Sequence, residues 1–180
     1  MQSLAGPFAV AAGLLVLGGA SKARRPDSTV RALGAAGARV PAALVRLFGA
    51  AEVAIGISAV LVGGRLPGAL VAASYAGFTA FVAVALRRRT PLASCGCFGR
   101  PDTPPTATHL AIIAAGTAVA GWAAVDPLPG IPAVLADPTG GGVPLLALVG
   151  LGLWLAYLAL AVLPTVRGGT VAAMSRLEAP

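Results

Sequence analysis

The sequence predicts an all-α fold, a polytopic bundle of transmembrane helices with a four-helix core and a fifth C-terminal span. Hydrophobic residues make up 57% of its 180 residues and charged residues only 11%, whereas a soluble domain carries about 25% charged residues. The apolar residues form long runs that do not alternate with polar residues, as the strands of a membrane β-barrel would. Because lipid offers no hydrogen-bond partners to the backbone, such runs are expected to be helical.

Five runs come close to the roughly 20 apolar residues that a spanning helix needs. The predicted spans are Leu4–Ala20, Ala42–Val62, Gly68–Leu86, Ala107–Val125 and Leu145–Leu163. The run Gly63-Gly64-Arg65-Leu66-Pro67 predicts a tight turn that makes the second and third spans an antiparallel hairpin. We expect a four-helix membrane domain over residues 1–130, followed by a loop, the fifth span and a short tail over residues 131–180.

The segment between the first and second spans has two interpretations. One helical face gathers small and apolar residues, namely Val30, Leu33, Gly37 and Val40, and leaves Arg31 and Arg39 off it. This pattern is typical of a short helix on the membrane surface. The alternative is an ordinary basic loop.

The net charge of +7 is distributed between the apolar spans. It forms no basic face with interleaved aromatic residues, so we expect the lipid bilayer and not nucleic acid as a partner. Two loops carry nine basic residues: Lys22, Arg24, Arg25, Arg31 and Arg39 in one, and Arg87, Arg88, Arg89 and Arg100 in the other. The opposite loops carry only Arg65. The positive-inside rule therefore predicts that the N-terminus is outside, and that the C-terminus and the loop after the third span are cytoplasmic.

Two cysteines, Cys95 and Cys97, flank Gly96 in the loop between the third and fourth spans. A disulfide tolerates Cα separations of about 4.4–6.8 Å, and an extended pair two residues apart lies near the upper limit. Gly96 would ease the bend, but so tight a bridge is strained and easily reduced. The pair therefore predicts reversible dithiol–disulfide exchange. The alternatives are thiols that only pack, and a soft-metal site for copper(I) or zinc; two sulfurs leave zinc two ligands short, so we predict no metal site.

Two further polar residues are candidates for chemistry. His109, the only histidine, begins the fourth span at about the depth of the cysteines, where it could accept a proton from a thiol or simply be an interfacial polar residue. Glu52 lies at the middle of the second span, where a carboxylate is costly. We expect Glu52 to face the bundle interior and approach Ser74 or Tyr75, as a proton or ligand site or as a structural hydrogen bond, with Glu52→Gln tolerated structurally.

The run Cys95-Gly96-Cys97-Phe98-Gly99 after the third span resembles the signature of the methylamine-utilisation MauE family. Two further features are similar: the first-helix exit Gly19-Ala20-Ser21-Lys22 and the acidic Glu52 in the second span. The resemblance covers roughly Leu4 to Val125, and the family is distantly similar to DoxX-like membrane proteins. It implies a four-helix membrane core, thioredoxin-like partners and a link to the maturation of disulfide-rich enzymes such as methylamine dehydrogenase.

Together, the motif and the resemblance predict an integral membrane thiol-redox component. Cys95 and Cys97, assisted by Glu52 and His109, would exchange dithiol and disulfide with a thioredoxin-fold partner, in methylamine dehydrogenase maturation or a related redox system. No cofactor is required, although a quinone in the bundle could take electrons onward. The cytoplasm keeps thiols reduced, so we expect mainly dithiol at rest. The alternatives are a non-catalytic membrane accessory or anchor and a soft-metal-binding membrane protein, and whether the chain is an enzyme stays open.

Overall fold

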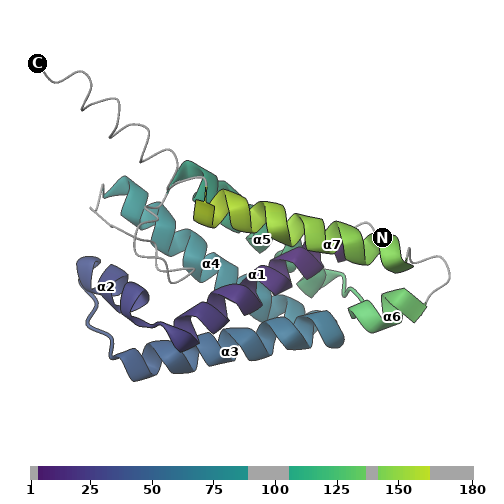
Figure 1. Ribbon diagram of the computed structural model, residues 1–180, viewed down its shortest axis with the longest axis horizontal. Coiled ribbons are helices and arrows are strands. Elements are labelled where there is room, and N and C mark those ends of the chain that lie inside the picture. The colour runs from purple at the N-terminus through teal and green to yellow at the C-terminus, as the bar shows by residue number, and fades with distance from the viewer. Residues whose placement is uncertain (1–3, 89–105, 137–141, 163–180) are drawn as a thin grey trace, which may run out of the picture.

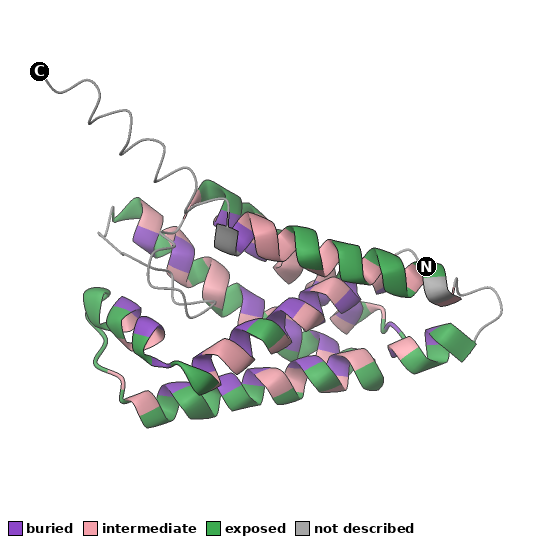
Figure 2. Cartoon of the chain, in the orientation of Figure 1, coloured by how far each residue is buried: buried purple, intermediate pink, exposed green. Residues whose placement is uncertain are grey.

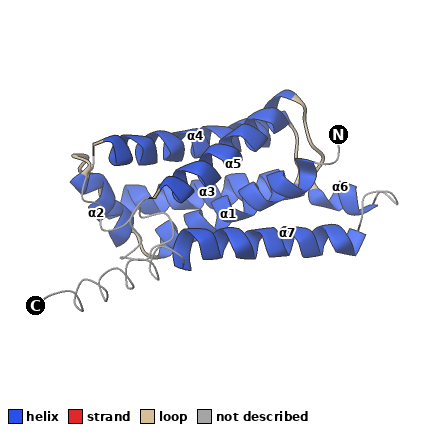
Figure 3. Cartoon of the chain, turned by 90° about the horizontal axis from the view of Figure 1, so that it is seen from above, coloured by secondary structure: helices blue, strands red, loops and turns tan. Residues whose placement is uncertain are grey.

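The computed structural model describes residues 4–88, 106–136 and 142–162, and within these ranges the regular structure is helical (Figure 1). The predicted all-α class is confirmed. The helices are α1 (Ala5–Arg24), α2 (Asp27–Ala35), α3 (Ala42–Leu61), α4 (Arg65–Arg87), α5 (Ala107–Val125), α6 (Ile131–Ala136) and α7 (Gly142–Tyr157), which continues as a π-helical segment over Leu158–Val162. Figure 3 shows how few residues connect most of these helices.

Four of the helices, α1, α3, α4 and α5, are long and apolar enough to cross a membrane. They correspond to the first four predicted spans, and α5 has the predicted bounds. Helix α1 continues past its predicted end at Ala20 to Arg24, which places Lys22 in its last turn. The predicted fifth span corresponds to α7, an apolar helix that is shorter than these four.

Helix α1 is the centre of the bundle. It packs against α3 on one side and α7 on the other, while α4 and α5 pack against each other (Figure 1). Over half of the residues of its most apolar stretch are buried, against 28% or less in α3, α4 and α5. Large apolar side chains such as Leu47, Val62 and Leu148 are exposed on the outside of the bundle (Figure 2). This outward apolar surface is what a lipid environment requires.

The predicted hairpin between α3 and α4 is confirmed, because α3 ends at Leu61 and α4 begins at Arg65. Gly63 and Gly64 make the turn with φ of +69° and +90°, values that glycine adopts without steric cost. The amide of Gly64 donates a hydrogen bond of 2.9 Å to the carbonyl of Leu128. The turn is therefore tied to the α5–α6 connection, and α3 packs more extensively on α1 than on its hairpin neighbour α4.

The segment between α1 and α3 contains a helix, α2, so the helical interpretation is confirmed over the loop. Its buried residues are Ser28 and Ala32. Gly37, at φ +92°, and Val40 lie beyond the end of α2. Val30 and Leu33 of the predicted face are half-buried in α2, and Arg31 is exposed, so the helix is shorter than the predicted stretch but keeps the predicted difference between its sides.

Polar side chains connect α4 to α1 and to α5. The Tyr75 hydroxyl on α4 donates a buried hydrogen bond of 2.8 Å to the carbonyl of Ala11 on α1. The Thr117 hydroxyl donates to the carbonyl of Ile113 and lies 3.1 Å from the Thr79 hydroxyl across the α4–α5 interface. Each of these polar groups therefore has a hydrogen-bond partner inside the protein. Without one, burial among apolar side chains would be costly.

Candidate functional site

A buried ion pair joins α1 to α3. The Lys22 ammonium lies 2.7 Å from Oε2 of Glu52, and the two side chains are only 5% and 1% exposed. Lys22 comes from the last turn of α1, whereas Glu52 lies at the middle of α3. A charge in an apolar bundle is tolerated when an opposite charge meets it with a hydrogen bond.

Two glycines allow this approach. A Cβ atom built on Gly19 would lie 2.6 Å from the Gly49 carbonyl oxygen and 2.8 Å from the Glu52 Cβ. A Cβ atom on Gly49 would lie 2.6 Å from the Gly19 carbonyl oxygen and 2.9 Å from the Lys22 Cβ. Only glycine at both positions lets the backbones come this close, as in other membrane helix pairs. The glycine contact therefore sets the distance between the two charged side chains.

The predicted position of Glu52 in the bundle interior is confirmed, but its predicted partner is wrong. The Ser74 hydroxyl donates to the Leu70 carbonyl of its own helix, and the Tyr75 hydroxyl donates to Ala11. Glu52 pairs with Lys22 because α1, and not the hairpin neighbour α4, packs closely on α3.

The role of Lys22 was not predicted, because its position after the first apolar run made it one of the loop charges. The useful signal was one acidic and one basic residue at the ends of two glycine-containing stretches, Gly19-Ala20-Ser21-Lys22 and Gly49-Ala50-Ala51-Glu52. Both stretches space glycine and charge by three residues. In antiparallel helices, such spacing brings each charge beside the opposite glycine.

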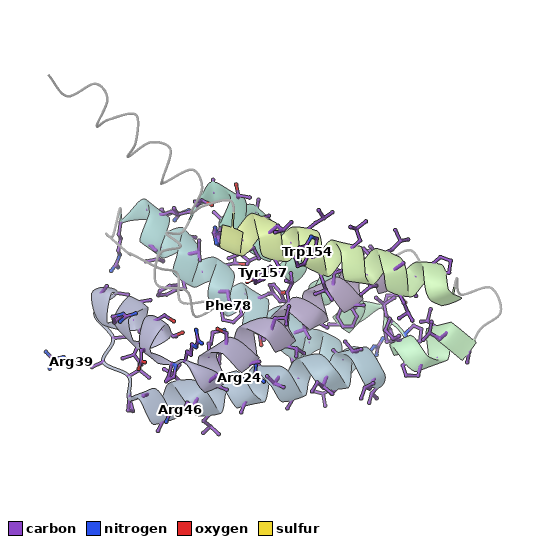
Figure 4. All side chains as sticks on the ribbon, viewed as in Figure 1. Arg24, Arg39, Arg46, Phe78, Trp154 and Tyr157 are labelled. Carbon is purple, nitrogen blue, oxygen red and sulfur yellow. The ribbon has the colours of Figure 1, made fainter. Side chains whose placement is uncertain are left out.

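One carboxylate oxygen of the ion pair can still accept a hydrogen bond. Oε1 of Glu52 is buried and has no hydrogen-bond partner among the described residues. The Lys22 ammonium lies 4.5 Å from the centroid of the Phe78 ring, within the range of a cation–π contact. The Tyr75 ring meets Phe78 edge-on, with centroids 6.2 Å apart. Phe78 lies on α4 beside α1 (Figure 4), so three helices contribute to this cluster.

His109 occupies a second buried position, at the start of α5, and is 2% exposed. Thr106 caps this helix: its hydroxyl accepts a hydrogen bond from the His109 amide at 3.3 Å and lies 2.9 Å from Nδ1 of the ring. Nε2 is buried without a partner among the described residues. The cap therefore fixes the ring by one nitrogen and leaves the other available.

Cys95 and Cys97 lie outside the described residues, so the structure places only the helix ends on either side of them. Helix α4 ends at Arg87 before the cysteine loop, and α5 begins at Ala107 after it. His109 and Glu52 have different hydrogen-bond partners, Thr106 and Lys22 respectively. Within the described ranges, no three His, Cys, Asp or Glu side chains gather as metal ligands.

Four membrane-length helices packed around a buried ion pair define a multi-pass membrane protein. A family model described as "Methylamine utilisation protein MauE" matches residues 3–126, from α1 to the end of α5. The chain therefore belongs to the MauE family, a family of methylamine utilisation. No curated protein and no solved structure matches the chain. The matched range includes Lys22, Glu52, the cysteine pair and His109, whereas α6 and α7 lie outside it.

Proposed function

We propose that this protein is the membrane component of a thiol-redox system, in which Cys95 and Cys97 exchange dithiol and disulfide with a thioredoxin-fold partner. The observation that carries the proposal is the state of His109. Its ring is buried and fixed by Thr106, and Nε2 has no partner among the described residues. His109 lies in the first turn of α5, 12 residues after Cys97. A proton acceptor at this point of the chain is what a reactive thiol of the Cys-Gly-Cys run needs.

The exchange proceeds in two balanced steps. One thiol of the pair transfers its proton to His109, and the thiolate attacks a disulfide sulfur of the partner, so that a mixed disulfide forms and one partner thiolate leaves. The second cysteine then loses its proton and attacks the mixed disulfide, which closes Cys95–Cys97. The two protons given up by the pair go to the two partner sulfurs, so the partner leaves as a dithiol, and the exchange is reversible. Arg87 and Arg88 at the end of α4 favour the thiolate electrostatically.

The physiological context of this exchange is also part of the proposal. Methylamine dehydrogenase is rich in disulfides, and a protein that interacts with a thioredoxin-fold partner would serve its maturation or that of a related enzyme. We place the cysteine loop on the cytoplasmic side, because basic residues flank it. There the pair rests mainly as a dithiol and closes transiently during exchange.

Single cysteine variants test the proposal. In the native host, Cys97→Ser should trap a mixed disulfide through Cys95, or Cys95→Ser through Cys97, and mass spectrometry of the trapped complex should identify a thioredoxin-fold protein. The double Cys→Ser variant is the matched control and should trap nothing. A double variant that supports full function in the host would show instead that the protein is a non-catalytic accessory. Stoichiometric copper or zinc, lost in the double variant, would show a soft-metal protein.

A further inference from the structure

A groove opens between α2, α3 and α4, next to the ion pair. Its volume is about 370 Å³, within the roughly 300–1,000 Å³ typical of small-molecule sites. The lining is mainly apolar and includes the rings of Phe48, Phe78 and Phe81. Among the described residues that line the groove, Lys22 is the only charged one. We propose that this groove binds the ring of a lipid-soluble quinone, with Lys22 donating a hydrogen bond to a ring carbonyl.

The access route favours a ligand that arrives through the bilayer. Leu44 and Phe48 line the groove and are about half exposed, on a helix whose length and composition suit a membrane span. Helix α2 supplies Ala32 and Leu33 to the lining and lies at the end of the bundle where the chain between α1 and α3 returns (Figure 1). A molecule dissolved in the lipid would therefore enter sideways, between α2 and α3.

The charges at the groove favour a ligand whose polar head group is neutral and carries an acceptor oxygen. Lys22 has three N–H donors, and the structure assigns one of them to Glu52. Since Glu52 already neutralises Lys22, an anionic head would leave a surplus negative charge in an apolar surrounding, which is costly. A carbonyl oxygen accepts a hydrogen bond from the ammonium without adding charge. This argues for a quinone over a fatty acid or a phospholipid phosphate.

The aromatic lining selects a flat ring. Phe78 is held in place by the edge of Tyr75 and by the Lys22 ammonium over its face. A ring ligand can pack against phenylalanine rings in offset or edge-on geometry, whereas an acyl chain gains nothing from their orientation. The lining also includes the Ser74 hydroxyl, whose oxygen retains acceptor capacity while its hydrogen bonds Leu70.

The redox consequence rests on the proposed function, whereas binding does not. The Cys95 and Cys97 dithiol would give two electrons and two protons to the quinone, leaving a disulfide and a quinol. The thiol exchange, run in the opposite direction with a partner dithiol as the reductant, would then restore the Cys95 and Cys97 dithiol. Lys22 lies in the last turn of α1, and α4 runs in the same direction as α1 and ends at Arg87, before the cysteine motif in the sequence. Binding is therefore measured in the cysteine-free double variant, so that its failure and the failure of the thiol-exchange proposal are separate results.

The test measures binding of a decyl-substituted benzoquinone to the purified cysteine-free protein in nanodiscs, with decylbenzene as a ligand of similar shape without ring oxygens. We expect saturable binding of the quinone and at least tenfold weaker binding of decylbenzene. An azido derivative of the quinone should label peptides of α3 and α4 on illumination. Equal affinity for both ligands would overturn the proposal, because the groove would then be an ordinary lipid-filled surface.

Two glycine variants provide a matched steric pair. Gly77 lines the groove and Gly121 on α5 does not, yet a Cβ atom on either would meet nothing within 4 Å. Gly77→Leu should fill the groove and weaken quinone binding at least tenfold, while Gly121→Leu should leave it unchanged. The double variant Lys22→Met/Glu52→Met removes the donor together with its counter-charge and should lose the preference for quinone over decylbenzene. Unchanged binding in Gly77→Leu, or labelling elsewhere in the chain, would refute the site.

Discussion

Gly19 of α1 and Gly49 of α3 pack backbone against backbone, and each occupies the space that a Cβ atom on the other would need. The contact is reciprocal, and the next glycine of α3, Gly56, packs in the same way against Val16 and the Ala12 carbonyl. Residue numbers rise along one helix as they fall along the other, so the helices are antiparallel. Without this close approach, the side chains of Lys22 and Glu52 could not meet at 2.7 Å between two buried helices.

The glycine contact should be sensitive to a single methyl group. Gly49→Ala should lower the free energy of unfolding by about 1–3 kcal/mol, the usual cost of overpacking a filled interface. The measurement is thermal unfolding of the purified protein in detergent. Gly121→Ala is the control, because its Cβ would meet no atom within 4 Å and alanine favours the helix. Equal stability of Gly49→Ala and Gly121→Ala would contradict the close packing.

The ion pair changes the expectation for Glu52→Gln, which sequence analysis took to be tolerated. This variant leaves the Lys22 ammonium buried without a counter-charge, and breaking a buried pair from one side costs about 3–5 kcal/mol. Lys22→Met should be milder, because the carboxyl of Glu52 can take up a proton. The double variant Lys22→Met/Glu52→Met should recover most of the loss. Thermal unfolding of all three variants gives the coupling free energy, and additive losses would show that the two side chains do not interact.

The bond that ties α4 to α1 should also be measurable. Tyr75→Phe removes the hydroxyl that donates to Ala11, with an expected loss of about 1 kcal/mol in the free energy of unfolding. Ser74→Ala is a neighbouring control, since its hydroxyl bonds only to the Leu70 carbonyl within α4. Denaturation of both variants in the same detergent should rank Tyr75→Phe as the less stable, and the reverse order would argue against the α1–α4 bond.

His109 gives a prediction that needs only a thiol reagent. His109→Gln keeps a polar side chain but removes the proton acceptor, so alkylation of Cys95 and Cys97 by iodoacetamide should become several-fold slower near neutral pH. The difference should vanish at high pH, where thiols ionise unaided. A thermal unfolding curve of the same variant separates this effect from simple loss of packing. Identical alkylation profiles in the variant and the parent protein would exclude His109 as the base.

The orientation in the membrane can be tested with fusions. Removing Lys22 from the charge comparison, because it is buried in the bundle, leaves eight basic residues in the two loops against Arg65 opposite. Arg24, Arg39 and Arg46 lie toward the α2 end of the bundle (Figure 4). We expect a reporter after Pro180 to be active in the cytoplasm, and one placed in the α3–α4 turn to be active outside. Activity of the Pro180 fusion only outside would reverse the assignment.

The fold class and the positions of the long helices follow from local patterns in the chain. Apolar runs of membrane length leave the backbone no alternative to helix, so the bounds of α5 and the start of α3 followed directly from composition. The glycine turn between α3 and α4 was equally local, because positive φ at Gly63 and Gly64 is a property of the residues themselves. The cysteine motif and Glu52 also marked the family that the chain belongs to.

Which helices are neighbours depends on contacts between distant parts of the chain. The two spans joined by a short turn form the predicted hairpin, yet α3 packs mainly on α1. The neighbours of a helix depend on complementary surfaces formed by residues far apart in the chain, such as Gly19 and Gly49. A pattern along the sequence does not show that these two glycines meet. Lys22 therefore looked like a loop charge until α1 was seen to extend through it and to lie against Glu52. Glu52 can be buried because Lys22 neutralises it, and Lys22 reaches Glu52 because α1 packs closely on α3.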